Sequence, residues 1–266
     1  MSTPMKPRIL TVIQARTGST RLPNKVLLNL GGRPVLERML ERVCAAKFVG
    51  KVVVATTTER DDEQIVALCR TLGISYFRGH PTDCLLRHYE ALKAFPADAV
   101  MKIPSDCPLI DPRVIDKVLS VFLRNYGQFD YVSNLHPATF PDGNDVEVIL
   151  GTALDIAVEK ARRPIDREHT TPYFWQNPNQ FRLSNVVMEG AKDFSQSHRW
   201  VLDYKEDYQL VQSIFEELYP IDHLFSLERI LDLFAKKPHL MKVNAKWLGD
   251  SWQRRDEGSF DPHARA

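Results

Sequence analysis

Cysteine is scarce in this chain of 266 residues, and the four that occur include no C-x-x-C pair. They are Cys44, Cys69, Cys84 and Cys107. The eight histidines lack the spacing that metal ligands show. These absences argue against a structural zinc site, and they predict that the cysteines are buried free thiols.

Long apolar runs are missing as well. The longest ones, such as residues 52–55, are far too short to cross a bilayer. Residues 1–8 contain no apolar core of the length that a signal peptide has. We therefore expect a cytoplasmic protein that has no membrane partner.

An excess of either charge is also absent. The 35 Lys and Arg residues nearly balance the 34 Asp and Glu residues, which leaves a formal net charge of +1. A polybasic nucleic-acid binder needs a large positive excess, so nucleic acid is not an expected partner. A small anionic ligand remains compatible with this balance, because basic residues can be concentrated in one place. The 12 glycines and 17 prolines are too few and too scattered for a low-complexity chain.

Strand and helix patterns alternate in the first half of the chain. Short apolar runs predict strands, and apolar residues at helical spacing predict helices between them. The expected strands cover 8–15, 51–56, 75–78 and 99–103, and the expected helices begin near 35, 61, 85 and 112. This alternation over about 125 residues predicts an α/β fold, with a mainly parallel sheet and helices on both faces.

The second half is less regular. Strands are expected at 129–133 and 145–150, and helices at 152–163, 205–219 and 226–237. Residues 181–188 and 200–202 are expected to form a small projecting strand pair, as an arm or a dimer element. Neither a repeat nor a strong linker divides the chain, so we expect a single domain over 1–266, with a polar tail at 253–266.

A basic loop directly follows the first expected strand. Ligands of an open parallel sheet bind beyond the carboxyl ends of its strands. Arg16, Arg21 and Lys25 place three cations there, and Gly18 lets the backbone come close to an anion. The loop suits a polyphosphate, although it is not a P-loop because G-x-x-x-x-G-K-[ST] is absent. Composition alone is equally compatible with a solvated basic turn.

Two carboxylates follow other expected strands. Asp106 comes after strand 99–103, where it could bind Mg²⁺ together with phosphate oxygens or could cap a turn. Asp203 follows residues 200–202 and could supply a second carboxylate to the same metal. Asp111 and Asp207 are expected to be structural, because each lies at the start of an expected helix.

Residues 13–27 carry a longer motif, Ile-Gln-Ala-Arg-Thr-Gly-Ser-Thr-Arg-Leu-Pro-Asn-Lys-Val-Leu, and further motifs follow it in order. They are Phe77-Arg78-Gly79 with Asp83 and Arg87, then 105–111, 130–134, 141–147, 167–173, and Arg199-Trp200 with Leu202-Asp203 and Glu206-Asp207. Together they resemble the sugar cytidylyltransferases, which include CMP-ketodeoxyoctonate and CMP-sialic acid synthetases, and most closely the SpsF-like branch. Asn24 departs from the glycine that is usual in this family, and Cys84 departs from an aliphatic residue.

The resemblance implies a fold and an activity. The fold would be a glycosyltransferase-A-like, Rossmann-type sheet, commonly in a homodimer. The activity would be transfer of CMP from CTP to an acidic sugar with Mg²⁺ and release of pyrophosphate, for surface polysaccharide biosynthesis. The expected partners are CTP and a sugar such as a nonulosonic or octulosonic acid. Residues 8–150 would form the nucleotide-binding core, and residues 151–250 the sugar-binding and dimerisation part.

The resemblance also implies roles for individual residues. The expected catalytic residues are Arg16, Arg21, Lys25 and Asp106. The expected nucleotide-binding residues are Ala15, Arg16, Gly18, Ser19, Arg21, Lys25, Arg78, Gly79 and Asp83. The expected metal ligands are Asp106 and Asp203.

The sugar is expected to lie over the second half of the chain. Asp142, Asn144 and Glu147 could form hydrogen bonds with its hydroxyl groups. Arg167 and His169 could meet a carboxylate on the sugar. Arg167 could instead cap the helix that begins nearby, and His169 could be a partly buried histidine of the fold.

Three other functions remain open from the sequence. A UTP- or GTP-dependent nucleotidyltransferase usually opens with a Gly-rich loop, whereas residues 15–18 are Ala-Arg-Thr-Gly. A metal-dependent glycosyltransferase usually needs D-x-D, whereas Pro108 follows Asp106 at the third position. A non-catalytic protein that binds a nucleotide sugar would bind CTP without releasing pyrophosphate.

Overall fold

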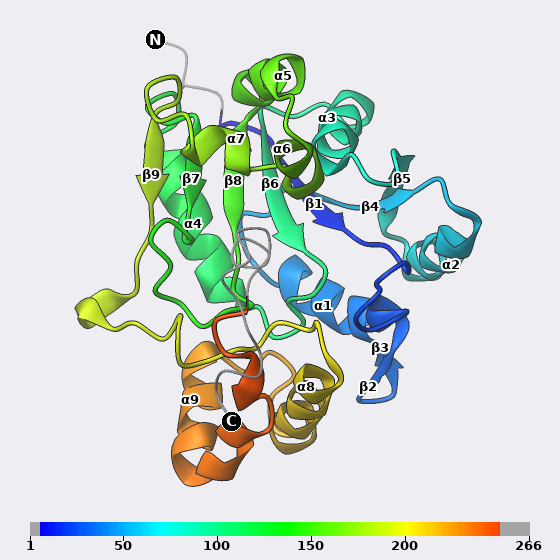
Figure 1. The fold of residues 1–266 in the computed structure, drawn as a ribbon, viewed down its shortest axis with the longest axis vertical. Helices are drawn as coiled ribbons and strands as arrows, with labels where there is room; N and C mark the ends of the chain where they lie inside the picture. Colours follow the sequence, from blue (N-terminus) through cyan, green and yellow to red (C-terminus); the bar gives the residue numbers. More distant parts are fainter. Residues whose placement is uncertain (1–5, 251–266) are drawn as a thin grey trace.

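A seven-stranded sheet runs through the middle of the protein (Figure 1). The computed structural model describes residues 6–250. The strands are β1 (Ile9–Gln14), β4 (Lys51–Thr57), β5 (Ser75–Gly79), β6 (Ala99–Pro104), β7 (Tyr131–Ser133), β8 (Glu147–Leu150) and β9 (Leu183–Asn185). They lie in the order β5-β4-β1-β6-β8-β7-β9. All neighbours pair in parallel except β8, which is antiparallel to both β6 and β7. The predicted mainly parallel sheet is confirmed.

Helices cover both faces of this sheet (Figure 1). The helices are α1 (Val35–Cys44), α2 (Glu63–Leu72), α3 (Cys84–Ala94), α4 (Pro112–Arg124), α5 (Gly151–Lys160), α6 (Pro164–His169), α7 (Pro172–Trp175), α8 (Lys205–Leu218) and α9 (Leu227–Lys236). Of these, α8 and α9 lie below the sheet in the view of Figure 1. Five short 3₁₀ helices join them: η1 (Lys25–Leu27), η2 (Arg60–Asp62), η3 (Glu189–Ala191), η4 (Pro238–Lys242) and η5 (Ala245–Trp247). The predicted flanking helices are confirmed.

Strand β1 lies between two apolar cores. Ile9 and Ile13 belong to a core that also contains residues of α1, α4, α8 and α9, whereas Leu10 and Val12 belong to a second core with residues of α3, α5 and α7. Side chains alternate between the two faces of a strand, so a strand that is buried on both faces is apolar at most of its positions. This burial explains why the sequence of β1 shows no polar face.

The predicted helix start at Asp111 is confirmed. Its carboxylate accepts a hydrogen bond from the Arg113 backbone N–H at 2.8 Å, as a helix cap does. The second carboxylate oxygen accepts from the Leu227 backbone N–H at 2.7 Å. Asp111 thus joins the beginnings of α4 and α9, which is the structural role expected for it.

The predicted strand pair lies elsewhere. Residues 183–185 form β9, which joins the main sheet beside β7, and residues 200–202 form no strand. The apolar alternation at Trp200 and Leu202 arises because both side chains are buried in the core between the sheet and α9, without ladder partners. The small two-stranded sheet is instead made by β2 (Asn29–Leu30) and β3 (Arg33–Pro34), which are antiparallel.

The cysteine prediction holds at three of its four positions. Cys69, Cys84 and Cys107 are buried free thiols, but Cys44 is free and exposed at the end of α1. The helical pattern around Cys44 did not reveal that its own position faces outward. No helix within residues 6–250 combines the length and the apolar character needed to cross a membrane. The predicted polar tail, 253–266, lies outside the described residues.

Candidate active site

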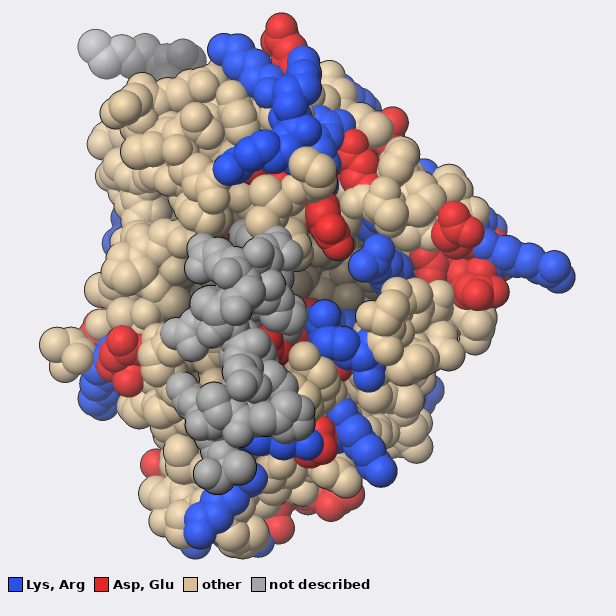
Figure 2. Space-filling view, viewed as in Figure 1, with Lys and Arg blue, Asp and Glu red and all other residues tan. Residues whose placement is uncertain are grey.

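A cavity of about 730 Å³ opens beyond the carboxyl ends of β1 and β6. Figure 2 shows basic and acidic side chains meeting around a hollow on this face. Among the predicted site residues, those that line the cavity are Ala15, Arg16, Gly18, Ser19, Arg21, Lys25, Asp106, Asp142, Glu147, His169 and Asp203. The three polar clusters of the sequence therefore meet at one edge of the sheet, where the strand directions place them.

The basic loop is anchored at its beginning. The backbone N–H and the hydroxyl of Thr17 each donate to Asp62 Oδ1 at 2.7 Å. Although burial alone would raise the pKa of Asp62, hydrogen bonds from Thr57 and Thr17 outweigh it and lower that pKa. Asn24 has a φ of 55°, in the left-handed region that Gly and Asn tolerate best. Asn24 thus takes the left-handed turn of this loop, at a position where the resemblance implied Gly.

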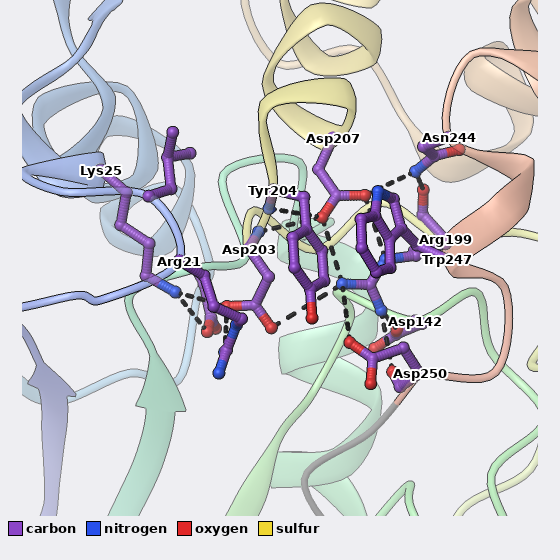
Figure 3. A network of polar contacts seen from close by, with 12 residues as sticks. Arg21, Lys25, Asp142, Arg199, Asp203, Tyr204, Asp207, Asn244, Trp247 and Asp250 are labelled. Atoms are coloured by element: carbon purple, nitrogen blue, oxygen red, sulfur yellow. Dashed lines mark hydrogen bonds and ion pairs between the residues drawn. The ribbon is translucent and has the colours of Figure 1, made fainter. Parts of the chain in front are cut away.

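Four charged side chains meet at the end of this loop (Figure 3). Lys25 Nζ lies between two carboxylates, at 3.0 Å from Asp106 Oδ2 and 2.9 Å from Asp203 Oδ1. Arg21 forms an ion pair with the same Asp203 oxygen at 2.7 Å. The Leu202 N–H donates to the Asp106 carbonyl oxygen at 2.7 Å, which holds the two acidic segments side by side. We call these four side chains, Arg21, Lys25, Asp106 and Asp203, the charge cluster.

Mutual attraction keeps the buried members of the charge cluster ionised. Burial would lower the pKa of Lys25, but the charges of Asp106 and Asp203 outweigh it and raise that pKa. Burial would likewise raise the pKa of Asp203, but Lys25 and Arg21 hold it far below its usual range. An opposite charge at this distance favours the charged form of both partners. Lys25 is therefore an ammonium and Asp203 a carboxylate at neutral pH.

Asp207 fixes the backbone on which Asp203 lies (Figure 3). Its fully buried carboxylate accepts hydrogen bonds from the backbone N–H groups of Asp203 at 3.0 Å and Tyr204 at 2.9 Å. The same carboxylate binds Arg199 through Nε at 3.0 Å and Nη2 at 3.1 Å, and Asn244 Nδ2 at 2.8 Å. Asp207 thus faces away from the cavity into a buried network, as its position in the first turn of α8 suggested.

Further carboxylates line the same cavity. Asp142 forms an ion pair with Arg199 at 3.2 Å. Glu147 forms a buried ion pair with Lys102 and accepts a hydrogen bond from the Tyr131 hydroxyl at 2.6 Å. Burial would raise the pKa of Glu147, but Lys102 and the hydrogen bonds outweigh it and lower that pKa. Burial and the nearby charge of Asp145 raise the pKa of Asp142 well above its usual range in spite of Arg199, so of these two carboxylates only Glu147 is kept charged by its basic partner.

Asp145 is a cavity residue that the sequence analysis missed as a site residue. Within residues 6–250 it has no basic partner at ion-pair distance, and its carboxylate accepts only a long bond, 3.4 Å, from the Gly143 N–H. Burial, with the nearby charges of Asp106 and Glu147, raises the pKa of Asp145 to about 7. Its spacing from Glu147 was the available signal, because residues two apart share one face of a strand.

Arg87 and Lys102 also line the cavity and were not assigned to it. Arg87 is buried and donates to the carbonyl oxygens of His80 and Pro81, so it supports the loop before α3. Lys102 could have been noticed as the only charged residue in the apolar run 99–103.

Five predicted site residues are not among the described residues that line the cavity. Arg78 forms an ion pair with Glu63 at 2.6 Å, and Gly79 is buried beside Arg87. Asn144 is also buried, and its Oδ1 accepts from the Asp111 N–H at 3.0 Å. The contacts of these three residues are thus with other parts of the protein, so they support the fold.

The other two bind each other. Asp83 caps α3 by accepting from the Leu86 N–H at 2.8 Å. Its second oxygen accepts from Arg167 Nε at 2.8 Å and Nη2 at 2.5 Å. The pair fastens α6 to the start of α3, and α6 in turn holds His169 at the cavity.

Known proteins resemble this chain over almost its whole length. A family model described as cytidylyltransferase matches residues 10–243. Spore coat polysaccharide biosynthesis protein SpsF of Bacillus subtilis is 30% identical over 215 residues, which cover 79% of this chain and 87% of that protein. A 3-deoxy-manno-octulosonate cytidylyltransferase of Solibacter usitatus is 31% identical over 247 residues, which cover 86% of this chain and 96% of that protein. The solved structure of a cytidylyltransferase from Leptospira borgpetersenii has a TM-score of 0.82 at 32% identity, and the match covers 89% of this chain and 97% of that one.

Proposed function

This chain belongs to the cytidylyltransferase family, and from that premise we propose that it transfers CMP from CTP to a sugar acid and releases pyrophosphate. The observation that carries the proposal is the position of Lys25. This residue of the basic loop reaches two carboxylates at the carboxyl edge of the sheet, inside a cavity large enough for a nucleotide and a sugar. The relatives named for octulosonate transfer and for spore coat polysaccharide synthesis support the sugar as acceptor.

The basic loop would bind the triphosphate. Arg16 and Arg21 are exposed at the cavity, and Lys25 is more deeply buried. An oxygen of the sugar would attack the α-phosphorus, and the bond from this phosphorus to the pyrophosphate oxygen would break. These cations would balance the negative charge that grows on pyrophosphate as it leaves. The protein contributes mainly by holding the two reactants in line and by supplying fixed positive charge.

Asp106 and Asp203 would hold Mg²⁺. Both carboxylates already face one cation, Lys25 Nζ, so they are placed to share another. Within residues 6–250, no group of three or more His, Cys, Asp or Glu side chains is arranged to hold a metal ion. Two carboxylates completed by phosphate oxygens and water suit Mg²⁺, so the residues fit this ion. Bound there, Mg²⁺ would supply positive charge beside the reacting phosphate.

The sugar would occupy the half of the cavity that Asp142, Asp145 and Glu147 line. Their carboxylate oxygens can accept hydrogen bonds from sugar hydroxyl groups. His169 lines the same cavity and would face a carboxylate of the acceptor, whereas Arg167 is held by Asp83. We include in the proposal a cytoplasmic homodimer that serves surface polysaccharide synthesis, which the family resemblance and the name of SpsF support.

The proposal can be tested by measuring pyrophosphate release. The full-length protein is incubated with Mg²⁺, with CTP, UTP, GTP or ATP, and with a panel of octulosonic and nonulosonic acids. We expect release with CTP and at least one acid. Release with UTP or GTP alone would indicate another nucleotidyltransferase, and CTP binding without release from any acid would indicate a binding protein.

A pair of matched variants connects the activity to the site. Asp106→Asn is expected to reduce turnover by at least about 100-fold while the protein stays folded, as for loss of a group that acts on the transition state. Asp155→Asn is the control, because Asp155 is an exposed carboxylate that pairs with Lys93 at 3.1 Å and does not line the cavity. Normal turnover in Asp106→Asn would refute its assignment.

A further inference from the structure

The charge cluster is neutral as a whole. Arg21 and Lys25 carry two positive charges, and Asp106 and Asp203 carry two negative charges. Lys25 is the more buried of the two cations, with 12% of its side chain exposed against 35% for Arg21. The two carboxylates proposed as metal ligands are therefore already neutralised by the protein itself.

Asp203 has a positive group near each of its oxygens. Oδ1 contacts Lys25 at 2.9 Å and Arg21 at 2.7 Å, and Oδ2 lies 3.7 Å from Arg199 Nη2. A divalent ion that bound both Asp203 and Asp106 would lie beside the Lys25 ammonium or in its place. Like charges at such short range repel strongly in a partly buried site. The nucleotide-free arrangement thus disfavours a metal at this position.

A triphosphate changes this balance. Its phosphate oxygens compete with the two carboxylates for Lys25, whose flexible four-carbon stem lets the ammonium move. Lys25 belongs to the same loop as Arg16 and Gly18, so the phosphates would bind on the side of the cavity from which its side chain extends. Once the ammonium contacts phosphate, Asp106 and Asp203 are free for a divalent cation that the phosphates also help to bind.

We infer that Lys25 is a built-in counter-ion, which keeps divalent metal away from Asp106 and Asp203 until a nucleoside triphosphate draws its ammonium aside. The inference rests on the proposed function, because it takes these carboxylates as the metal ligands. Metal loading is then coupled to nucleotide binding, and the free enzyme does not hold the ion. Lys25 accordingly has two successive partners, the carboxylates before nucleotide binding and the phosphates after it.

The test measures Mn²⁺ binding to the full-length protein without nucleotide, from the electron paramagnetic resonance signal of free Mn²⁺. Lys25→Met removes the ammonium and keeps most of the stem. It is expected to bind Mn²⁺ at least about tenfold more tightly than wild type, or about 1.4 kcal/mol. Lys93→Met is the control, since it removes an exposed ammonium that also pairs with one carboxylate but lies away from the cavity. It is expected to bind Mn²⁺ as wild type does.

A second comparison identifies the site that the ion occupies. The double variant Lys25→Met/Asp106→Asn is expected to lose the gain in Mn²⁺ affinity. Equal Mn²⁺ affinity of Lys25→Met and wild type would overturn the inference. The inference would also be overturned if the wild-type protein bound Mn²⁺ without nucleotide and the Asp106→Asn variant did not. This second comparison does not depend on the folding of a Lys25 variant. No turnover is involved, so failure of the proposed function, seen as no pyrophosphate release, is a separate result.

Discussion

Replacing Asp207 by Asn removes one negative charge from a buried network that supports the site. The carboxylate is fully buried and binds Arg199 twice, Asn244 once, and two backbone N–H groups (Figure 3). An amide has the same shape but only one acceptor oxygen, so its NH₂ group would face donors. Removing one partner of a buried ion pair costs about 3–5 kcal/mol. Arg199 keeps Asp142 at 3.2 Å, so we expect the lower end, about 3 kcal/mol.

This loss should be visible in thermal unfolding. A chain of this length loses about 2–4 °C in Tm per kcal/mol, so Asp207→Asn is expected to melt about 6–12 °C below wild type. Activity should fall as well, because a single amide oxygen cannot accept from all the donors that now bind the carboxylate, and the backbone that carries Asp203 is held less firmly. Circular dichroism melts and pyrophosphate release measure the two effects.

The neighbouring carboxylate provides the control. Glu206 pairs with Lys246 at 2.8 Å on a more exposed part of the same helix turn. Glu206→Gln is expected to cost no more than about 1 kcal/mol, as exposed ion pairs do. If Asp207→Asn had the same Tm as Glu206→Gln and the wild type, the reasoning about the buried network would be refuted. A double variant that also carries Arg199→Met should cost less than the sum of the two single losses.

Three further predictions concern the fold and the loops. Burial lowers the pKa of His88 from 6.5 to about 3, so between these pH values the unfolded chain binds more protons than the folded protein and acid destabilises the fold. His88→Leu should reduce the slope of unfolding free energy against pH by up to about 1.4 kcal/mol per pH unit. An unchanged slope, measured by urea unfolding at several pH values, would contradict this. Gly143→Ala should lower the Tm more than Gly190→Ala. Both positions have a positive φ, but only at Gly143 would the added Cβ lie 2.8 Å from the Trp200 backbone. Equal melting temperatures of the two variants would contradict this. Gly18→Ala should leave the Tm unchanged, since no atom lies within 4 Å of the added Cβ, but should raise the KM for CTP if the loop backbone approaches phosphate; an unchanged KM speaks against that approach.

Local sequence patterns predicted the structure best where they report burial. β1 is mostly apolar because both of its faces are covered, and Asp111 begins a helix because its side chain can cap the first turn. The same rule failed at residues 200–202, whose apolar alternation suggested a strand. Trp200 and Leu202 are buried against helices and the sheet face, and alternation alone does not distinguish these two kinds of burial.

In the candidate site, too, some positions follow from the chain order and others depend on contacts in space. The order of strands places Arg16, Lys25 and Asp106 at one edge of the sheet, because parallel strands end together. Arg78 and Asp83 were expected near the nucleotide, but their side chains are occupied by Glu63 and Arg167. A charged residue near an expected site can bind the ligand or stabilise the fold, and only its neighbours in space distinguish the two roles.

The sequence by itself determined the α/β fold, the basic loop and the acidic residues at the ends of the strands. The hydrophobic period of an element and its capping residues depend on a few neighbouring residues, and the order of elements can be read along the chain. These features can therefore be recognised without a structure. Tertiary structure alone decided that Lys25 lies between Asp106 and Asp203, which are 81 and 178 residues away from it. It also decided which groups Asp207 binds, namely Arg199, Asn244 and the backbone of Asp203 and Tyr204. Ion pairs depend on distance in space and on burial, which a linear pattern does not contain.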